Sequence, residues 1–244
     1  MIRLILVAIF LIIFFILSIP VFFIEFIIGK FNMKRKLLSS TRIVQGAFRL
    51  VLFISGVKVT VKGRENLPSP DEAVLYVGNH RGFFDIVVSH VCFPGVTGFV
   101  AKKEIDKVPF LRVWMRNIGC LFLDRKNIKE GLKTILQGIE SIKNGTSLVI
   151  FPEGTRSTTN QLLDFKEGSL KLAEKSGCNI IPMAINNTSA VFEDHFPAIK
   201  SAHVIIEFGK PVVLKELDKE DRKFLGAHLQ KIIQEMVDRN AAEV

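Results

Sequence analysis

The chain has 244 residues, of which 48% are hydrophobic and 23% charged, which excludes disorder as its general state and suits one α/β domain with an appended segment. Its three cysteines are odd in number and widely spaced, which excludes a disulfide framework and a thiolate zinc site. The net charge is +9, and residues 1–60 hold eight Lys or Arg against one acidic residue, Glu25. This clustering beside the most apolar part of the chain favours an anionic lipid surface as partner over nucleic acid.

The first predicted element is an apolar helix long enough to cross a bilayer. Residues 4–24 are apolar except for Ser18 and Pro20, and a helix of these 21 residues spans ~31 Å. A cleaved signal peptide is the rival interpretation, but no small-residue cleavage site precedes Lys30. By the positive-inside rule, the basic residues after the run predict that the rest of the chain stays on the cytoplasmic face of a membrane: Lys30, Lys34, Arg35 and Lys36.

A second helix is predicted over residues 39–55, where Arg42, Gln45 and Arg49 form one polar stripe beside an apolar face. This pattern is typical of a helix at a membrane surface, although a helix packed on the globular domain has the same pattern. We therefore expect a two-helix membrane-anchoring segment over residues 1–56, as one span plus a surface helix or as a hairpin in one leaflet. An α/β domain is expected over residues 57–244.

Strands and helices alternate after residue 56. This alternation predicts an α/β fold with a central, mostly parallel β-sheet flanked by helices. Strands are expected at residues 57–63, 73–78, 97–102, 120–124, 147–151, 179–185 and 203–209. Helices are expected at residues 84–92, 109–117, 128–143, 166–176 and 219–240.

The first chemical motif, Asn-His-Arg-Gly-Phe-Phe-Asp, directly follows the predicted strand 73–78. Its His80 lies just past a strand end, where open α/β sheets place their reactive groups. A turn at Arg81-Gly82 allows Asp85 to reach back to one imidazole nitrogen and to stabilise the imidazolium as it forms. The motif therefore predicts a general base, although Asp85 as a simple helix cap gives the same spacing.

Three further strand ends carry cations or polar turns. The motif Phe-Pro-Glu-Gly-Thr-Arg-Ser at 151–157 places a glutamate and an arginine on a glycine turn, and the planar guanidinium matches phosphate oxygens. Gly-Cys-Leu-Phe-Leu-Asp-Arg at 119–125 ends on Arg125, and Lys102 ends the strand 97–102. Together these groups predict an anion site at one edge of the sheet, although each alone is typical of a solvated surface charge.

Several motifs are absent. The chain has no Gly-x-Ser-x-Gly elbow, Walker A loop, Gly-x-Gly-x-x-Gly or metal-binding histidine pair, so we expect neither a cofactor nor a metal. With a base and no evident protein nucleophile, the simplest chemistry is direct. His80 takes a proton from a substrate hydroxyl, which then attacks an activated acyl carbon.

Taken together, the motifs resemble those of the glycerolipid acyltransferases, and within them those that acylate lysophosphatidic acid. The family's His-x₄-Asp block is matched at 80–85, its Gly-x-x-Phe-x-x-Arg block at 119–125, and its Phe-Pro-Glu-Gly-Thr-Arg-Ser block letter for letter at 151–157. A short apolar block containing proline is matched at 180–185. The order and the gaps fit over about residues 56–215, and an N-terminal anchor is also usual for the family.

The resemblance implies transfer of an acyl group from acyl-CoA or acyl carrier protein to the sn-2 hydroxyl of 1-acyl-sn-glycerol-3-phosphate, giving phosphatidic acid. It implies His80 as general base and Asp85 as its orienting partner. Acceptor binding is implied for the remaining site residues, with the cations on phosphate: Glu153, Gly154, Thr155, Arg156, Arg125 and Lys102. Other acceptors (another lysophospholipid or glycerol-3-phosphate), a membrane thioesterase and a non-catalytic membrane lipid-binding protein remain as alternatives.

Overall fold

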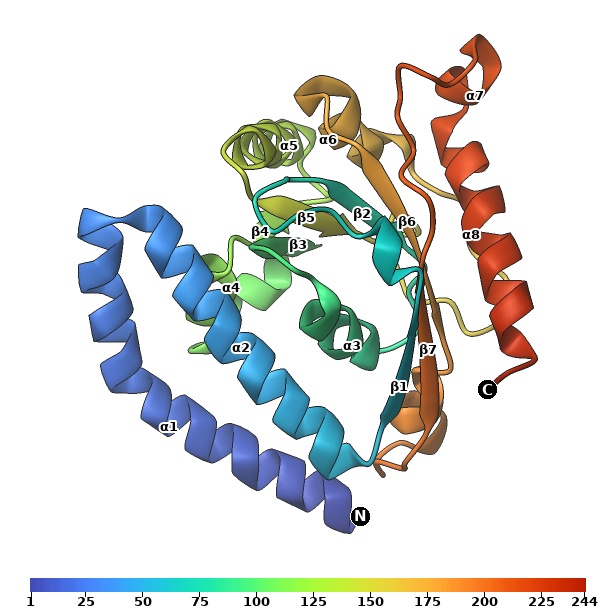
Figure 1. Cartoon of the computed structure of the whole chain (residues 1–244). Helices are drawn as coiled ribbons and strands as arrows, with labels where there is room; N and C mark the ends of the chain where they lie inside the picture. Colours follow the sequence, from blue (N-terminus) through green and yellow to red (C-terminus); the bar gives the residue numbers. More distant parts are fainter.

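The computed structural model describes residues 1–244, and its centre is a seven-stranded sheet (Figure 1). In spatial order the strands are β1, β7, β6, β2, β5, β3 and β4. Their bounds are Lys58–Lys62 (β1), Leu75–Gly78 (β2), Thr97–Lys102 (β3), Leu121–Leu123 (β4), Ser147–Ile150 (β5), Ile180–Asn186 (β6) and His203–Phe208 (β7). All seven predicted strands are present.

The sheet is mostly parallel, as predicted. β6, β2, β5, β3 and β4 run in one direction, whereas β7 pairs antiparallel with β6 and parallel with β1. The carboxyl ends of the five parallel strands therefore lie at one edge of the sheet. The loops that follow them, after residues 78, 102, 123, 150 and 186, emerge at that edge.

Helices cover both faces of the sheet (Figure 1). On one face lie α3 (Phe84–Cys92), α4 (Leu111–Asn117) and the two N-terminal helices, and on the other α5 (Ile128–Lys143), α6 (Glu167–Ser176) and α8 (Leu225–Ala241). Successive side chains of a strand point to opposite faces, so Tyr76 and Val149 enter the first core, whereas Leu75 and Leu148 enter the second. Both layers are needed because a buried parallel sheet is apolar on its two faces.

The two N-terminal helices are longer than predicted and follow each other with almost no loop. α1 spans Ile2–Phe31 and α2 spans Met33–Ser55. Asn32 between them begins α2 as a helix cap, since its side chain accepts a hydrogen bond from the backbone N–H of Arg35 at 2.9 Å. Gly56 ends α2 in the left-handed conformation, with φ of 69°. Both helices are long and apolar enough to cross a membrane.

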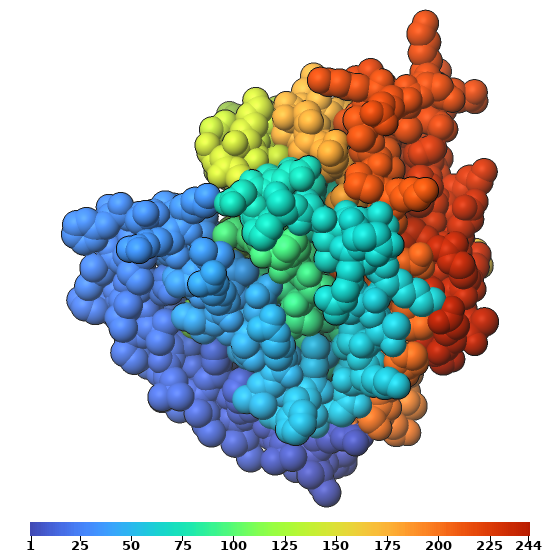
Figure 2. Space-filling view, viewed as in Figure 1, coloured from blue at the N-terminus to red at the C-terminus, as the bar shows by residue number.

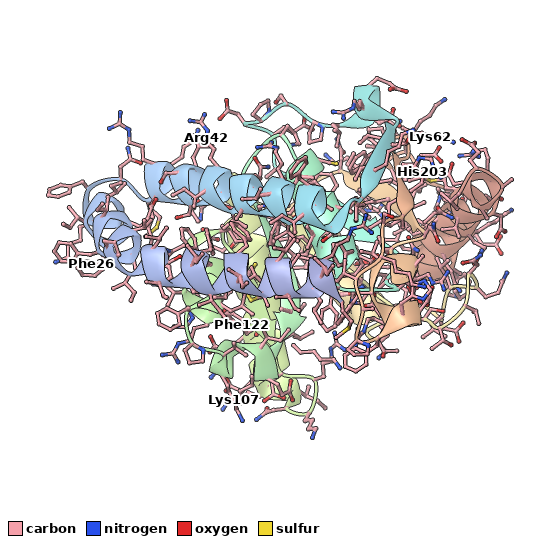
Figure 3. The ribbon with its side chains drawn as sticks, turned by 90° about the horizontal axis from the view of Figure 1, so that it is seen from below. Phe26, Arg42, Lys62, Lys107, Phe122 and His203 are labelled. Atoms are coloured by element: carbon pink, nitrogen blue, oxygen red, sulfur yellow. The ribbon has the colours of Figure 1, made fainter.

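The helical pair packs on the α/β part instead of standing apart from it. α1 and α2 lie side by side, with Phe26 near the outer end of the pair (Figure 3), and their surface is continuous with that of the rest of the chain (Figure 2). The indole of Trp114 on α4 stacks on Phe14 at 5.4 Å between ring centroids and donates to Ser18 Oγ at 2.8 Å.

Buried apolar residues of both helices join the core under α3: Val7, Val44, Val51 and Leu52. The structure thus supports the packed alternative for the second helix. The outer face of α1 carries large exposed apolar side chains along its length. The division of the chain at residue 56 into an anchor and a domain remains a prediction.

The five helices predicted after residue 56 are present, but the last is not continuous. Residues 219–240 form α7 (Lys219–Lys223) and α8, which are separated at Phe224, whose φ of −114° and ψ of 46° leave the helical region. The prediction of one continuous helix was wrong. Apolar residues keep a helical spacing across Phe224, so the sequence pattern does not reveal the break in the backbone.

Candidate active site

The loop after β2 is fixed on both sides, to β6 through Asn79 and to the loop after β5 through the backbone of His80. The side chain of Asn79 prolongs the sheet: its Nδ2 donates to the carbonyl of Ile185 at 2.9 Å and its Oδ1 accepts from the N–H of Ile185 at 2.8 Å. On the other side, the backbone carbonyl of His80 accepts from the N–H of Ser157 at 2.8 Å. His80 is therefore held at the carboxyl edge of the sheet, beside the loop 151–157.

His80 and Asp85 form the hydrogen bond that the sequence predicted. His80 Nδ1 lies 2.7 Å from Asp85 Oδ2, and Asp85 is 0% exposed. The carboxylate also accepts from the backbone N–H groups of Arg81 and Gly82 at 2.6 and 2.8 Å, and from the hydroxyl of Thr188. Because a carboxylate only accepts hydrogen bonds, the contact favours the imidazole tautomer with its proton on Nδ1 and its lone pair on Nε2.

The imidazole is also held against an aromatic ring. It stacks on Phe151, the first residue of the loop 151–157, with centroids 4.4 Å apart and planes inclined by 12°. Nε2 forms no hydrogen bond within the chain, and the side chain of His80 is one-fifth exposed. A base oriented by a carboxylate and open at its second nitrogen is the arrangement that proton abstraction from a hydroxyl requires.

Glu153 lies beside His80 but faces inward. It is 2% exposed, and each carboxylate oxygen accepts a backbone N–H, from His80 at 2.7 Å and from Leu163 at 2.9 Å. Burial raises the pKa of Glu153, and the two backbone donors oppose that shift. The geometry gives Glu153 the position of a brace between two loops, with no free oxygen directed at a ligand.

Arg156 lies at the exposed side of the same loop. Its guanidinium sits over the ring of Phe83 at 4.5 Å and donates to Glu193 Oε1 at 3.2 Å. Glu193 Oε1 also accepts the N–H of Phe83 at 2.7 Å. A Cβ on Gly82 would lie 2.7 Å from Glu193 Oε2, so glycine leaves room for this carboxylate. Arg156 is thus positioned next to the His80 loop and partly neutralised.

Of the remaining predicted residues, Arg125 contacts Gly154, whereas Lys102 and Thr155 are exposed. Arg125 Nη1 donates to the carbonyl of Gly154, whose φ of 74° is in the left-handed region that favours glycine. Lys102 is exposed at the end of β3, in register with Leu123, two residues before Arg125. Thr155 is exposed and forms no side-chain hydrogen bond. The structure therefore brings Arg125 to the loop 151–157, whereas Lys102 lies at the exposed rim of the site, at the end of β3.

Three residues of the site were not predicted: Thr188, Glu193 and Lys166. Thr188 and Glu193 follow β6, whose carboxyl end lies beside that of β2, so their position past a strand end at the same edge was a usable signal. Lys166 directly precedes α6, and its Nζ lies 2.8 Å from where a Cβ on Gly154 would be. No local pattern around Lys166 indicates this contact.

The fold and the site define a class: an α/β protein with an oriented histidine base and several cations at the carboxyl edge of a parallel sheet. No group of three or more His, Cys, Asp or Glu side chains is arranged to hold a metal ion. The family model for acyltransferases matches residues 58–186, which contain the His80–Asp85 pair and the loop 151–157. The chain belongs to the acyltransferase family.

Individual relatives agree with this assignment. The chain is 32% identical over 194 residues to the 1-acyl-sn-glycerol-3-phosphate acyltransferase of Saccharomyces cerevisiae, covering 78% of this chain and 62% of that protein. It is 28% identical over 184 residues to the enzyme of the same name from Borreliella burgdorferi, covering 73% and 72%. The match thus spans less than two-thirds of the yeast relative.

The fold is also that of a solved structure. The 1-acyl-sn-glycerophosphate (LPA) acyltransferase of Thermotoga maritima aligns with a TM-score of 0.73 and 24% identity, covering 98% of this chain and 96% of that one. Since the coverage includes α1 and α2, the likeness in fold extends to the N-terminal helices.

Proposed function

We propose that this protein transfers an acyl group from a thioester donor, acyl-CoA or acyl carrier protein, to the sn-2 hydroxyl of 1-acyl-sn-glycerol-3-phosphate, producing phosphatidic acid. The observation that carries the proposal is the 2.7 Å contact between His80 Nδ1 and the buried Asp85, which leaves Nε2 free at a sheet edge lined by cations. The names of the relatives support the choice of acceptor.

The reaction needs no protein nucleophile. His80 Nε2 removes the proton of the acceptor hydroxyl as that oxygen attacks the thioester carbonyl. Asp85 stabilises the imidazolium that forms and holds its ring in one orientation. When the tetrahedral intermediate collapses, the carbon–sulfur bond breaks and the imidazolium returns its proton to the departing thiolate.

The other residues bind or position. Arg156 and Arg125 are proposed to hold the acceptor phosphate, with Lys102 adding positive charge at the rim. Gly154 lets the backbone approach the ligand, and the exposed Thr155 lies within reach of it. For Glu153 the geometry favours positioning over the substrate contact expected from sequence, since both of its oxygens are occupied by backbone N–H groups.

The N-terminal helices suit a substrate that stays in a membrane. Burying each CH₂ of an acyl chain is worth roughly 0.8 kcal/mol, so complete extraction of a lysolipid into water is costly. The exposed apolar face of α1 and the basic residues after it support membrane association, with the catalytic part on the cytoplasmic face. An enzyme held at the surface meets its acceptor without that extraction.

The test is an activity matrix of donors and acceptors with the full chain in mixed micelles. We expect release of free thiol that depends on lysophosphatidic acid. His80→Ala should reduce turnover by roughly 10²–10⁴-fold without changing the melting temperature. His228→Ala, a histidine of α8 that contacts Asp221 and lies outside the site, is the control.

Three results would redirect the proposal. Thiol release without any acceptor indicates a thioesterase, and stronger activity on another lysophospholipid or on glycerol-3-phosphate reassigns the acceptor. Binding of lipid without any transfer indicates a non-catalytic lipid-binding protein.

A further inference from the structure

Two cations without an acidic partner converge over Gly154. We propose that Lys166 and Arg125 form the subsite that recognises a phosphate monoester on the acceptor, and that Lys166 determines the preference for acceptors with this group. The inference rests on the proposed function and adds to it a residue that none of the sequence motifs contains.

The geometry places both head groups around one point. The position of a Cβ on Gly154 lies 2.8 Å from Lys166 Nζ and 3.4 Å from Arg125 Nη1. Arg125 is also tied to this turn, since Nη1 donates to the carbonyl of Gly154. Glycine at 154 therefore makes room for the Lys166 ammonium beside the Arg125 guanidinium, and the two nitrogen atoms lie no more than about 6 Å apart, a separation that the oxygens of one phosphate can bridge.

The charge of these two cations is not neutralised within the chain. Neither Lys166 nor Arg125 forms an ion pair, whereas Arg156 pairs with Glu193 at 3.2 Å and Lys103 pairs with Asp124 at 2.9 Å. An anion at Gly154 thus meets two unpaired charges, while an anion at Arg156 competes with a carboxylate. Lys166 and Arg125 therefore contribute more to binding the acceptor phosphate than Arg156, whose charge is shared with Glu193.

Lys166 is held in place by the backbone on both sides. Its N–H donates to the carbonyl of Pro152 at 3.0 Å, and the neighbouring Phe165 is buried in the core against α8. Glu153 ties Leu163 to the same loop. Because the segment 152–166 is closed on itself, Lys166 returns beside Gly154 despite the intervening residues.

The chemistry selects phosphate monoesters. A monoester carries a charge of about −1.5 to −2 at pH 7 and three terminal oxygens, enough for a guanidinium and an ammonium together. A phosphodiester headgroup has one charge and two free oxygens, and an uncharged glycerol has neither. The subsite therefore favours 1-acylglycerol 3-phosphate over lysophosphodiesters and monoacylglycerol.

The experiment compares lysophosphatidic acid with monoacylglycerol, which lacks only the phosphate. For the full chain in mixed micelles, we expect Lys166→Met to weaken equilibrium binding of lysophosphatidic acid and its kcat/KM by about tenfold, with monoacylglycerol unaffected. Lys166→Arg should restore most of the preference. Lys171→Met is the control, since Lys171 lies on α6, the helix that follows Lys166, and pairs with Glu174 at 2.6 Å.

The outcomes separate the subsite from the reaction. Equal losses on both lipids, or no loss on either, overturn the role of Lys166. Wild-type protein that binds lysophosphatidic acid no more tightly than monoacylglycerol overturns the subsite. If binding shows the phosphate preference but no acyl transfer occurs, the subsite stands and the proposed function fails.

Discussion

The loop before α3 and the last turn of α3 each carry a histidine, in opposite surroundings. His80 is partly exposed and bonded to a carboxylate through one nitrogen. His90 is 1% exposed, lies between the rings of Phe48 and Phe99, and has no hydrogen-bond partner on either nitrogen. Burial, with a smaller contribution from Arg49, lowers the pKa of His90 to about 4.

The contrast shows how the groups around an imidazole favour or oppose its protonation. In the proposed mechanism Asp85 stabilises the imidazolium that forms on His80, whereas the aromatic surroundings of His90 penalise a charged imidazole. His90 serves as a core side chain that packs like an aromatic ring. The two histidines therefore differ because of the groups that face their rings, a carboxylate at His80 and aromatic rings at His90.

The largest expected effect comes from removing the charge on the carboxylate next to His80. In Asp85→Asn an NH₂ group replaces one carboxylate oxygen and faces N–H groups whose hydrogen bonds that oxygen accepted. The imidazole therefore loses its fixed orientation. We expect kcat to fall by on the order of 10³-fold or more, as for other oriented histidine bases. Turnover within tenfold of wild type, in protein of unchanged melting temperature, would show that Asp85 does not orient His80.

Much of the His80 region was predictable because parallel strands end at one edge of a sheet. His80 and Arg156 each follow such an end, so their proximity follows from topology. Glu153 was correctly placed at that edge, but its inward orientation depends on the N–H groups of His80 and Leu163. Sequence patterns place a residue near an edge without showing which way its side chain turns.

The contacts that were not predictable join segments without a shared pattern. Lys166 returns to Gly154 through the fold of a long loop, and Glu193 occupies space left by Gly82. Similarly, the amphipathic stripe of α2 fits a membrane surface as well as the side of α3, and only packing distinguishes the two. Periodicity shows that a face is apolar but not what covers it.

The second prediction concerns the pH dependence of stability that the buried His90 causes. Since its folded pKa lies below the ordinary value of 6.5, the unfolded chain binds more protons between pH 6.5 and 4. Stability therefore falls as pH decreases through this window, by up to roughly 3 kcal/mol from this group. His90→Phe should flatten the pH dependence of unfolding and leave kcat nearly unchanged.

Denaturation at pH 7 and pH 4.5, for wild type and variant in the same detergent, measures the difference. An identical pH slope in both proteins would show that His90 is not penalised by burial. A large loss of kcat would remove the distinction between the two histidines.

The third prediction concerns the brace behind His80. Glu153→Gln replaces one acceptor oxygen by an NH₂ that faces a backbone N–H, which costs about the worth of one hydrogen bond. We expect kcat to fall about tenfold while the KM for the acceptor stays within twofold. A rise in acceptor KM at constant kcat would instead assign Glu153 to substrate binding, as the sequence predicted.

The smallest effect is expected at Glu193, which faces the His80 loop from the outside. Glu193→Gln keeps an oxygen for the N–H of Phe83 but removes the negative charge beside Arg156. Because Arg156 is 44% exposed and the pair is screened, we expect the KM for lysophosphatidic acid to fall only roughly threefold, with kcat unchanged. The gain should shrink in high salt and be absent with monoacylglycerol.

Asp194→Asn is the control for Glu193, because it removes a neighbouring exposed charge that makes no contact with Arg156. If both variants lower KM equally, the effect is one of overall charge and Glu193 has no particular influence on Arg156. If Glu193→Gln raises KM, the carboxylate orients the guanidinium for its ligand. The His80 region would then be rigid on its outer side as well, with Glu193 acting on Arg156 as Asp85 does on His80.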